Sequence, residues 1–387
     1  MGGSGFPEKV LAAVRSVAGE YGAVLHEPTF GGNEERNLHA CLRSTFVASG
    51  GRYVDEFEAE LGAVTGSAHV IAVASGTAAL QVALRLVGVA VGDEVLVPAL
   101  TFVATANAVS FLGAVPHFVD CEATTFGLDP SALREHLEAN AEMRGGRCIN
   151  RSTGRVIRAV IPVHVFGHPA PLEGLLRVAD EHGIAVVEDA AESLGSTRKS
   201  VHTGTIGEVG ALSFNGNKIV TTGGGGAVLT NAPELAARAR HLAYTAKVDH
   251  PWEYVHDEVG YNYRLPEINA ALGCAQLERL PELLERKRSL LARYTHAFED
   301  IDGLELVSEP PECSSNYWLH TIKIAEPVAV HRDSILELCN ASGYHLRPPW
   351  RPLHRLEPYG GCPRAGLPIA EHLYRTLINL PSSAHLA

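Results

Sequence analysis

The sequence predicts an α/β fold in which a mostly parallel sheet of about seven strands is covered by helices on both faces. From about residue 69 onward, short apolar runs rich in β-branched residues alternate with segments whose apolar residues recur at helical spacing. Parallel strands that are buried on both faces have such continuous apolar runs. The chain has 387 residues, of which 46% are hydrophobic and 20% charged, so it is long enough for about two to three folded domains.

Each expected element follows from its local pattern. Apolar runs predict strands at 69–75, 94–98, 116–120, 155–165 and 184–189. Helical spacing predicts the intervening helices, of which the second ends at a glycine and the third begins with a proline: 77–88, 101–113, 130–143 and 171–183. Two closely spaced strands, 211–215 and 226–231, follow, and we expect them to run antiparallel.

The pattern changes near residue 265. Two helices are expected, at 265–280 and 281–300, and the second is heavily charged, as a solvated face would be. A strand, a helix and a proline-rich stretch are expected after residue 300, at 317–324, 332–343 and 347–363. The organisation predicted is an N-terminal helical arm (1–40), a large α/β domain (41–280) and a smaller C-terminal α+β domain (281–387).

Charge and composition exclude several classes of function. The net charge is −12, which disfavours binding to nucleic acid or to an anionic membrane surface. No apolar run reaches the roughly 18–20 residues of a membrane span, and no secretion signal is recognisable, so we expect a cytoplasmic protein. The seven cysteines form no CxxC pair and the 19 histidines form no HExxH motif, so no metal site is expected.

Unusual residues follow three of the expected strands, where ligands of open α/β sheets bind. Ser75-Gly76-Thr77 lies between a strand and a helix, where backbone N–H groups can hold an anion, although such a serine is also an ordinary helix cap. Asp189 ends a buried strand and must cap a helix or pair with a buried group. Lys218 precedes four glycines, 223–226, which read equally as a mobile surface turn; no GxxxxGK[ST] nucleotide loop is present.

Together these three features match the requirements of pyridoxal phosphate. An anion cradle can hold its phosphate, a buried carboxylate can keep its pyridine nitrogen protonated, and a lysine can form the Schiff base. Each feature alone has an ordinary structural explanation, but the combination predicts this cofactor.

The segments that carry these residues resemble the DegT-type sugar-nucleotide aminotransferases. The resemblance rests on SGTAAL, GDEVLVPALTFVATANAV and VEDAAESLGS…GALSFNGNKIVTTGGGGAVLTN, and it runs from about residue 40 to near the C-terminus. It implies the type I pyridoxal phosphate fold (aspartate aminotransferase-like) and a homodimer. It also implies a role for nine residues: Lys218 as the Schiff-base lysine, Asp189 at the pyridine nitrogen, Gly76, Thr77 and Ser213 at the phosphate, Phe102 stacked on the ring, Glu192 at the phenolic oxygen, and Asn262 with Arg264 reaching the phosphate of the second subunit.

Glu192 differs from many members of that family, which have glutamine or histidine at this position. A carboxylate would repel the phenolic oxygen of the cofactor, so Glu192 is expected to be protonated or bridged by water if it points there.

The resemblance implies amino transfer from L-glutamate to a keto sugar. The segments WEYVHDEVGYNYR and SNYWLHTI are similar to those of enzymes that aminate C4 of a UDP-4-keto-6-deoxy sugar on the route to legionaminic acid and related bacterial surface sugars. A sister group that aminates a keto-deoxy-octulosonate has very similar segments and stays an alternative. Five residues are candidate sugar or nucleotide contacts: Asn316, Trp318, His320, Trp350 and His354.

Other readings of the sequence stay open. Some relatives are sugar dehydratases that carry histidine in place of the lysine, which Lys218 argues against. A non-catalytic regulator that kept the fold is a third class. His164 and His168, on a loop after an expected strand, could face a substrate or make structural hydrogen bonds.

Overall fold

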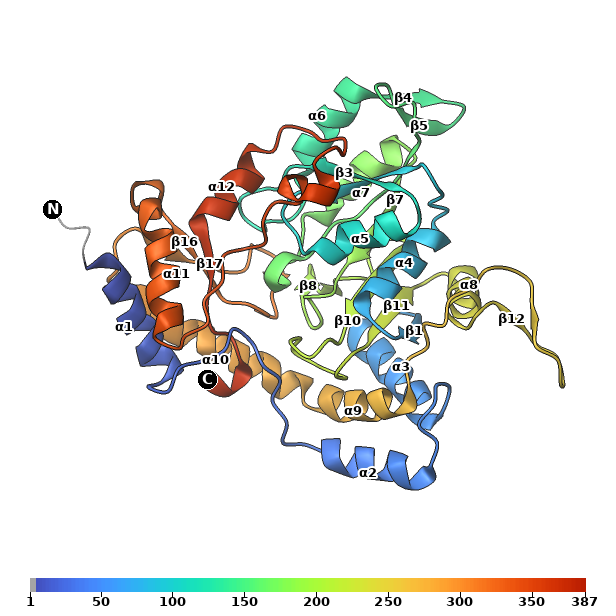
Figure 1. The fold of residues 1–387 in the computed structure, drawn as a ribbon, viewed down its shortest axis with the longest axis horizontal. Coiled ribbons are helices and arrows are strands. Elements are labelled where there is room, and N and C mark those ends of the chain that lie inside the picture. Colours follow the sequence, from blue (N-terminus) through green and yellow to red (C-terminus); the bar gives the residue numbers. More distant parts are fainter. Residues whose placement is uncertain (1–4) are drawn as a thin grey trace.

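The computed structural model describes residues 5–387, and its centre is a seven-stranded sheet (Figure 1). In spatial order the strands are β1 (His69–Val73), β11 (Gly226–Thr230), β10 (Val209–Ser213), β7 (Ala185–Asp189), β6 (Ile157–Val160), β2 (Glu94–Pro98) and β3 (Val115–Val119). Strand β11 pairs antiparallel with both of its neighbours, whereas the pairs from β10 to β3 are all parallel. The predicted mostly parallel, seven-stranded sheet is therefore confirmed, including its antiparallel strand.

Helices cover both faces of this sheet. One face carries α4 (Gly76–Leu86), α5 (Val103–Phe111) and α8 (Pro233–Ala243), and the other carries α6 (Pro130–Asn140) and α7 (Leu172–Glu181). Neighbouring residues of β3 show the alternation, because Phe118 belongs to the core on the α4 side and Val119 to the core on the α6 side. Helix α3 (Arg52–Thr65) packs on β1 and α9 (Glu267–Glu278), and α2 (Glu34–Ser44) packs on α9.

Three expected elements differ from the structure by three or more residues at one end. The helix expected to reach residue 143 ends at Asn140, and a hairpin of β4 (Ala141–Arg144) and β5 (Arg147–Asn150) follows it. The strand expected at 155–165 is a strand only over β6, and Pro162, which has no N–H to donate, follows two residues after its end. The strand expected from residue 317 begins at Thr321, because Tyr317 has a φ of 47° and cannot extend a strand.

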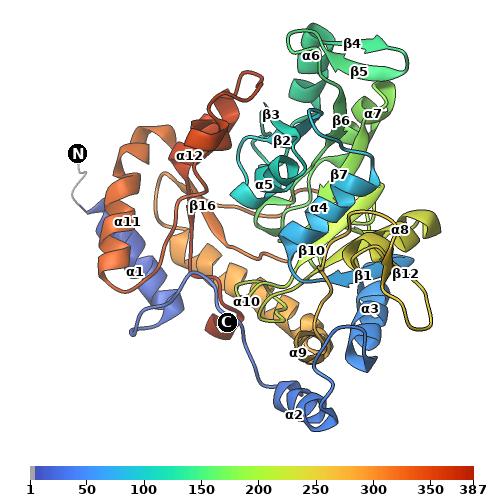
Figure 2. The same cartoon turned by 45° about the vertical axis from the view of Figure 1, so that its right-hand side comes forward.

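A second core lies beside the sheet. It contains an antiparallel sheet of β14 (Leu304–Leu306), β16 (Thr321–Ile324) and β17 (Leu377–Asn379), with α10 (Leu280–Phe298) and α11 (Arg332–Ala341). Helix α1 (Phe6–Ala18) contacts α10 and α11 and contributes Val10 and Val14 to this core, and both views show it beside α11 (Figures 1 and 2). The division at residues 40 and 280 stays a prediction.

The remaining elements are short. Helix α12 (Pro368–Thr376) precedes β17. Five two-residue strands form two small sheets: β15 (Cys313–Ser314), β8 (Thr197–Arg198) and β9 (Val201–His202) form one, and β12 (Lys247–Val248) and β13 (Val255–His256) form the other. None of the helices within residues 5–387 is at once long and apolar enough to cross a membrane.

Candidate active site

A cavity of about 540 Å³ opens where β1, β7 and β10 end at their carboxyl edges. Segments that are far apart in the sequence line it, from Leu25, ahead of α2, to Asn379 at the end of β17. The polar and aromatic residues of its wall are Ser75, Thr77, Thr101, Phe102, Thr105, Asp189, Glu192, Ser213, Asn215, Asn217, Lys218, Trp318, Arg347, Trp350 and Asn379. The three strand ends singled out in the sequence therefore meet at one cavity, as expected for an open α/β sheet.

The first turn of α4 forms one wall. Ser75 caps the helix, because its Oγ accepts a hydrogen bond from the Ala78 N–H at 3.1 Å. The N–H groups of Gly76 and Thr77 are the preceding donors of that helix and have no partner within it. A side chain at Gly76 would place its Cβ 2.7 Å from the Cβ of Ser213, so only glycine allows β10 to lie this close. This turn can hold an anion such as a phosphate.

Asp189 lies at the end of β7 and is buried. Its Oδ2 accepts a hydrogen bond from Thr105 Oγ1 at 2.8 Å, and its Oδ1 accepts one from the Ala191 N–H at 3.2 Å. Burial raises the pKa of the Asp189 carboxyl, while these hydrogen bonds and the charge of Lys218 oppose the rise. Within residues 5–387 no cationic side chain forms an ion pair with Asp189. A cationic ring nitrogen in the cavity would supply that partner.

Lys218 and Glu192 form a buried pair. The Nζ of Lys218 lies 3.5 Å from Oε1 of Glu192, and Oε2 of Glu192 accepts a hydrogen bond from the Phe166 N–H at 2.9 Å. Burial lowers the pKa of the Lys218 amine and raises the pKa of Glu192 to about 7. The free amine that a nucleophile or a proton carrier needs is thereby favoured at Lys218.

Two aromatic rings complete the wall. Phe102, the residue before α5, is 52% exposed, and its ring centroid lies 6.4 Å from that of Trp350. Trp350 in turn lies 4.9 Å from the ring of Phe166. Phe102 is thus available for a planar ligand, as its predicted stacking role requires.

Three of the five predicted substrate contacts lie outside this cavity: Asn316, His320 and His354. Asn316 is buried, and its amide donates to the carbonyls of Glu192 and Leu194, both at 2.9 Å. His320 is buried and bonds to Ser382 and to the Lys287 carbonyl, and His354 pairs with Glu371 at 2.8 Å. Trp318 and Trp350 are the two predicted substrate contacts that the structure brings to the cavity.

Asn262 and Arg264 also lie outside the cavity of their own chain. The backbone of Asn262 forms an isolated antiparallel β-bridge with Tyr244, and that of Arg264 forms one with Val73 at the end of β1. The Nε of Arg264 is buried without a hydrogen-bond partner in the described part of the chain. Their predicted role toward a second subunit stays a prediction.

Six polar lining residues were not expected from the sequence: Thr101, Thr105, Asn215, Asn217, Arg347 and Asn379. Thr105 has a recognisable signal, since it follows Thr101 by one helical turn in PALTFVAT. Arg347 begins the proline-rich stretch and forms no ion pair within residues 5–387. Nothing in the local sequence of Asn379 indicates that it reaches the site.

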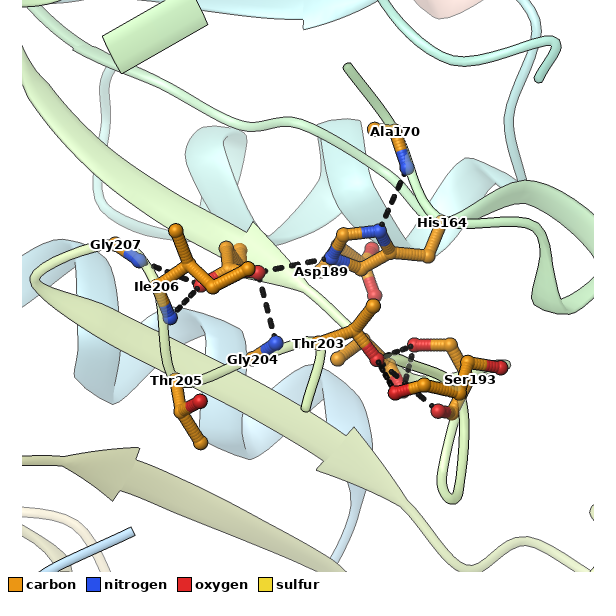
Figure 3. A network of polar contacts seen from close by, with 12 residues as sticks. His164, Ala170, Asp189, Ser193, Thr203, Gly204, Thr205, Ile206 and Gly207 are labelled. Carbon is orange, nitrogen blue, oxygen red and sulfur yellow. Dashed lines mark hydrogen bonds and ion pairs between the residues drawn. The ribbon is translucent and has the colours of Figure 1, made fainter. Parts of the chain in front are cut away.

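A hydrogen-bond network behind Asp189 fixes the end of β7 (Figure 3). The carboxylate of Glu188 is buried and accepts hydrogen bonds from the N–H groups of Gly204, Ile206 and Gly207 at 2.6–2.7 Å. His164 completes the set, because its Nδ1 accepts from the Ala170 N–H and its Nε2 therefore carries the proton that it donates to Glu188. The structure thus gives His164 a structural role.

His168 differs from His164. It is buried between the rings of Phe126 and Tyr317, and neither of its ring nitrogens has a hydrogen-bond partner among the described residues. Burial lowers the pKa of His168 to about 4, so its ring is neutral at physiological pH.

The residues present fit pyridoxal phosphate. The α4 turn and Ser213 suit a phosphate, the unpaired buried carboxylate of Asp189 suits a pyridinium nitrogen, and the buried amine of Lys218 suits a Schiff base. The fold and the site define a pyridoxal phosphate-dependent aminotransferase of the type I class.

The chain belongs to the DegT/DnrJ/EryC1/StrS aminotransferase family, whose model matches residues 28–387. It is 34% identical to GDP-perosamine synthase of Caulobacter vibrioides over 362 residues, which cover 93% of this chain and 92% of the other. It is 33% identical to a dTDP-3-amino-3,4,6-trideoxy-alpha-D-glucose transaminase of Streptomyces venezuelae, over 88% of this chain and 86% of that one.

Solved structures agree with the family assignment. The aminotransferase TlmJ of Streptoalloteichus hindustanus has a TM-score of 0.84 at 29% identity and covers 94% of both chains. DesI, solved in the presence of its TDP-sugar product, has a TM-score of 0.83 at 31% identity and covers 94% of this chain and 89% of its own. The predicted family, fold class, cofactor and enzyme class are therefore confirmed.

Proposed function

We propose that this protein transfers an amino group from L-glutamate to C4 of a UDP-linked 4-keto-6-deoxy-N-acetylhexosamine, for the synthesis of a bacterial surface sugar of the legionaminic acid type. The observation that carries the amino transfer is the meeting of Lys218, Asp189 and the α4 turn in one cavity. The segments of residues 252–264 and 315–322 support the acceptor, because they resemble those of enzymes that act on such UDP-sugars.

The side chains divide the work of the reaction. When bound, pyridoxal phosphate would supply the carrier for the amino group and the electron sink that the transfer needs. The N–H groups of Gly76 and Thr77, with Ser213, would hold its phosphate, and Asp189 would keep the pyridine nitrogen protonated. Burial lowers the pKa of the Lys218 amine, so its Nζ can accept a proton. Lys218 would move the proton between the α-carbon of the donor and the C4′ carbon of the cofactor.

Arg347 supports an anionic substrate at this site. Its guanidinium lines the cavity and forms no ion pair within residues 5–387, so it is available for a carboxylate of the donor or for the diphosphate of the acceptor. Apart from Lys218 no other cationic side chain belongs to the described wall of the cavity.

The second subunit completes the proposed enzyme. Asn262 and Arg264 lie outside their own cavity, and the buried Nε of Arg264 lacks a partner in the described chain, which supports a role for this segment across a dimer interface. A neighbouring copy would bring such groups to a phosphate held at Gly76 and Thr77.

A GDP-linked keto sugar is the second candidate acceptor. It is favoured by the relatives named GDP-perosamine synthase, which are 32–34% identical over more than 90% of this chain. The octulosonate alternative rests on similar segments alone. The dehydratase alternative is disfavoured because Lys218, rather than a histidine, occupies the cavity.

A screen of acceptors tests this proposal. The holoenzyme is incubated with L-glutamate and, in parallel, 4-keto UDP-sugars, 4-keto GDP-sugars and the eight-carbon keto acid, and products are identified by mass spectrometry. We expect the aminated UDP-sugar as the main product. If only the GDP-sugar or only the keto acid is aminated, the proposed UDP-sugar acceptor is wrong. If the product has lost water without gaining nitrogen, the proposed amino transfer is wrong.

A further inference from the structure

The face of one indole ring covers the amine of Lys218. The Nζ of Lys218 lies 3.7 Å from the ring centroid of Trp318, close enough for direct contact between the amine and the indole face. The Trp318 side chain is fixed at its other end, since its Nε1 donates to the Asn217 carbonyl at 2.7 Å. Asn217 directly precedes Lys218, so ring and amine are held by the same short segment.

The backbone around Trp318 is held in an unusual shape. Tyr317 has a φ of 47°, a left-handed conformation that an aromatic residue rarely adopts. The Trp318 N–H donates to Asn316 Oδ1 at 2.9 Å, and the Asn316 amide is anchored on the Glu192 and Leu194 carbonyls. Such strain persists where the surrounding contacts enforce it, and it is concentrated at functional sites.

A second lysine, Lys287, contacts the backbone of Trp318. Lys287 on α10 is completely buried, and its Nζ donates to the Trp318 carbonyl at 2.9 Å and to the Ser382 carbonyl. No carboxylate within residues 5–387 pairs with it, and burial holds the pKa of Lys287 well below its usual range. Burying an amine without an acid is costly, and a hydrophobic residue of the same length would pack there without that cost.

We propose that the Lys218 amine lies against the indole face of Trp318 whenever it is not bonded to the cofactor. Lys287 holds Trp318 in the required position through its hydrogen bond to the Trp318 carbonyl. Both are positioning residues that act on Lys218. A free amine on four methylene groups would otherwise sample many rotamers. On the indole face it stays beside Glu192, at a fixed place in the cavity. The inference rests on the role proposed above for Lys218.

Nuclear magnetic resonance of the cofactor-free protein tests the contact directly. The chain has only six lysines, so protein labelled with ¹³C at the lysine ε-carbon gives few signals, and Lys218→Arg identifies the one of interest. Protons above an aromatic face are shifted upfield by its ring current. We expect the Lys218 ε-proton signal to lie upfield, to move to the position of a water-facing lysine in Trp318→Leu, and to stay partly upfield in Trp318→Phe, which keeps an aromatic face.

Lys287 is tested in the same spectrum. Lys287→Met preserves the length of the side chain but removes the donors to the Trp318 carbonyl, so the Lys218 signal should lose most of its upfield shift. Lys323→Met, on β16, is the matched control and should leave the Lys218 signal in place. An unchanged far-ultraviolet circular dichroism spectrum and a cooperative thermal transition show that each variant is folded.

Two results would overturn the proposal. One is a Lys218 signal at the water-facing position in the unaltered protein, and the other is an upfield shift that survives in folded Trp318→Leu. An unchanged Lys218 signal in Lys287→Met would overturn the part assigned to Lys287. Since no cofactor or substrate is present, these outcomes are independent of whether the enzyme aminates a UDP-sugar.

Discussion

Lys218 is the residue on which the assignment of the site depends most directly. Lys218→Ala removes the amine that bonds to the cofactor, so we expect loss of the visible absorbance band of a Schiff base and a fall in turnover of several orders of magnitude. Mass spectrometry after borohydride reduction should find cofactor on the Lys218 peptide of the parent only. Lys199→Ala, at an exposed lysine, is the control. Wild-type turnover in Lys218→Ala would contradict the assignment.

Asp189 tests the electrostatics of the same site. Asp189→Asn keeps the shape of the side chain and its contact with Thr105 but removes the negative charge. Loss of one buried charge pair costs about 2–5 kcal/mol, so turnover should fall by well over tenfold, and cofactor affinity measured by absorbance titration should fall with it. Asp180→Asn, at an exposed position on α7, should change neither. A near-normal rate in Asp189→Asn would show that Asp189 has only a structural role, through its hydrogen bonds with Thr105 and Ala191.

The raised pKa of Glu192 predicts that the stability of the cofactor-free protein depends on pH. Its pKa is about 7 in the folded protein against an ordinary value of 4.5, so between these values the folded state keeps a proton that the unfolded chain releases. Stability from this group is therefore complete below about pH 4.5 and lost as pH rises to 7.

Glu192→Gln has no such proton, so in the cofactor-free protein its free energy of unfolding relative to the parent should rise between pH 5 and pH 8, by on the order of 2 kcal/mol. Urea denaturation at a series of pH values measures it, with exposed Glu305→Gln as the control that should give a flat difference. A flat difference for Glu192→Gln would mean that its carboxylate is ionised throughout this range.

Residues of the site were predictable from the sequence where their chemistry conflicts with their surroundings. A carboxylate ending an apolar strand, as at Asp189, and a lysine before four glycines, as at Lys218, are visible in the local sequence. Arg347 and Asn379 were not predictable, because they reach the cavity only through the packing of the second core beside the sheet. Local patterns do not encode that packing.

At the scale of elements, the close approach of α4 to β10 can be tested at Gly76. In Gly76→Ala the new Cβ would meet Ser213 Cβ at 2.7 Å, so the first turn of α4 must shift. We expect a loss of about 1–3 kcal/mol in stability and weaker binding of the cofactor phosphate. Thermal denaturation with and without pyridoxal phosphate measures both effects. Gly361→Ala, which has open space around it and an ordinary φ, should behave like the parent. Unchanged cofactor affinity in Gly76→Ala would argue against a phosphate at this turn.

The sheet was easier to predict than the elements around it. Strands such as β2 and β7 are continuous apolar runs, and both begin and end within about one residue of the expected bounds. The β4–β5 hairpin was missed because Ala141–Arg144 continues a helix-forming composition, and only its pairing with Arg147–Asn150 defines it as a strand. Tertiary pairing overrode local propensity at this place.

At the scale of the whole molecule, long-range packing limits what the sequence alone can predict. Helix α1 lies against α10 and α11, more than 260 residues further along the chain, and no local signal indicates this contact. Assembly is limited in the same way, since Asn262 and Arg264 can be assigned to a partner only if two copies associate. A homodimer is the commonest oligomer, and the net charge of −12 would keep a dimer soluble.

A mixed dimer tests whether the active sites are shared. One subunit carries Lys218→Ala, and the other carries Asn262→Ala with Arg264→Ala; different affinity tags allow the mixed species to be purified. If the segment of residues 260–264 serves the partner, one of the two sites holds both defects and the other holds neither. Both parent variants should then be nearly inactive as homodimers, whereas the mixed dimer should recover up to about half of the wild-type activity. No recovery in the mixed dimer, or full activity of a monomer identified by light scattering, would show that this segment serves its own subunit.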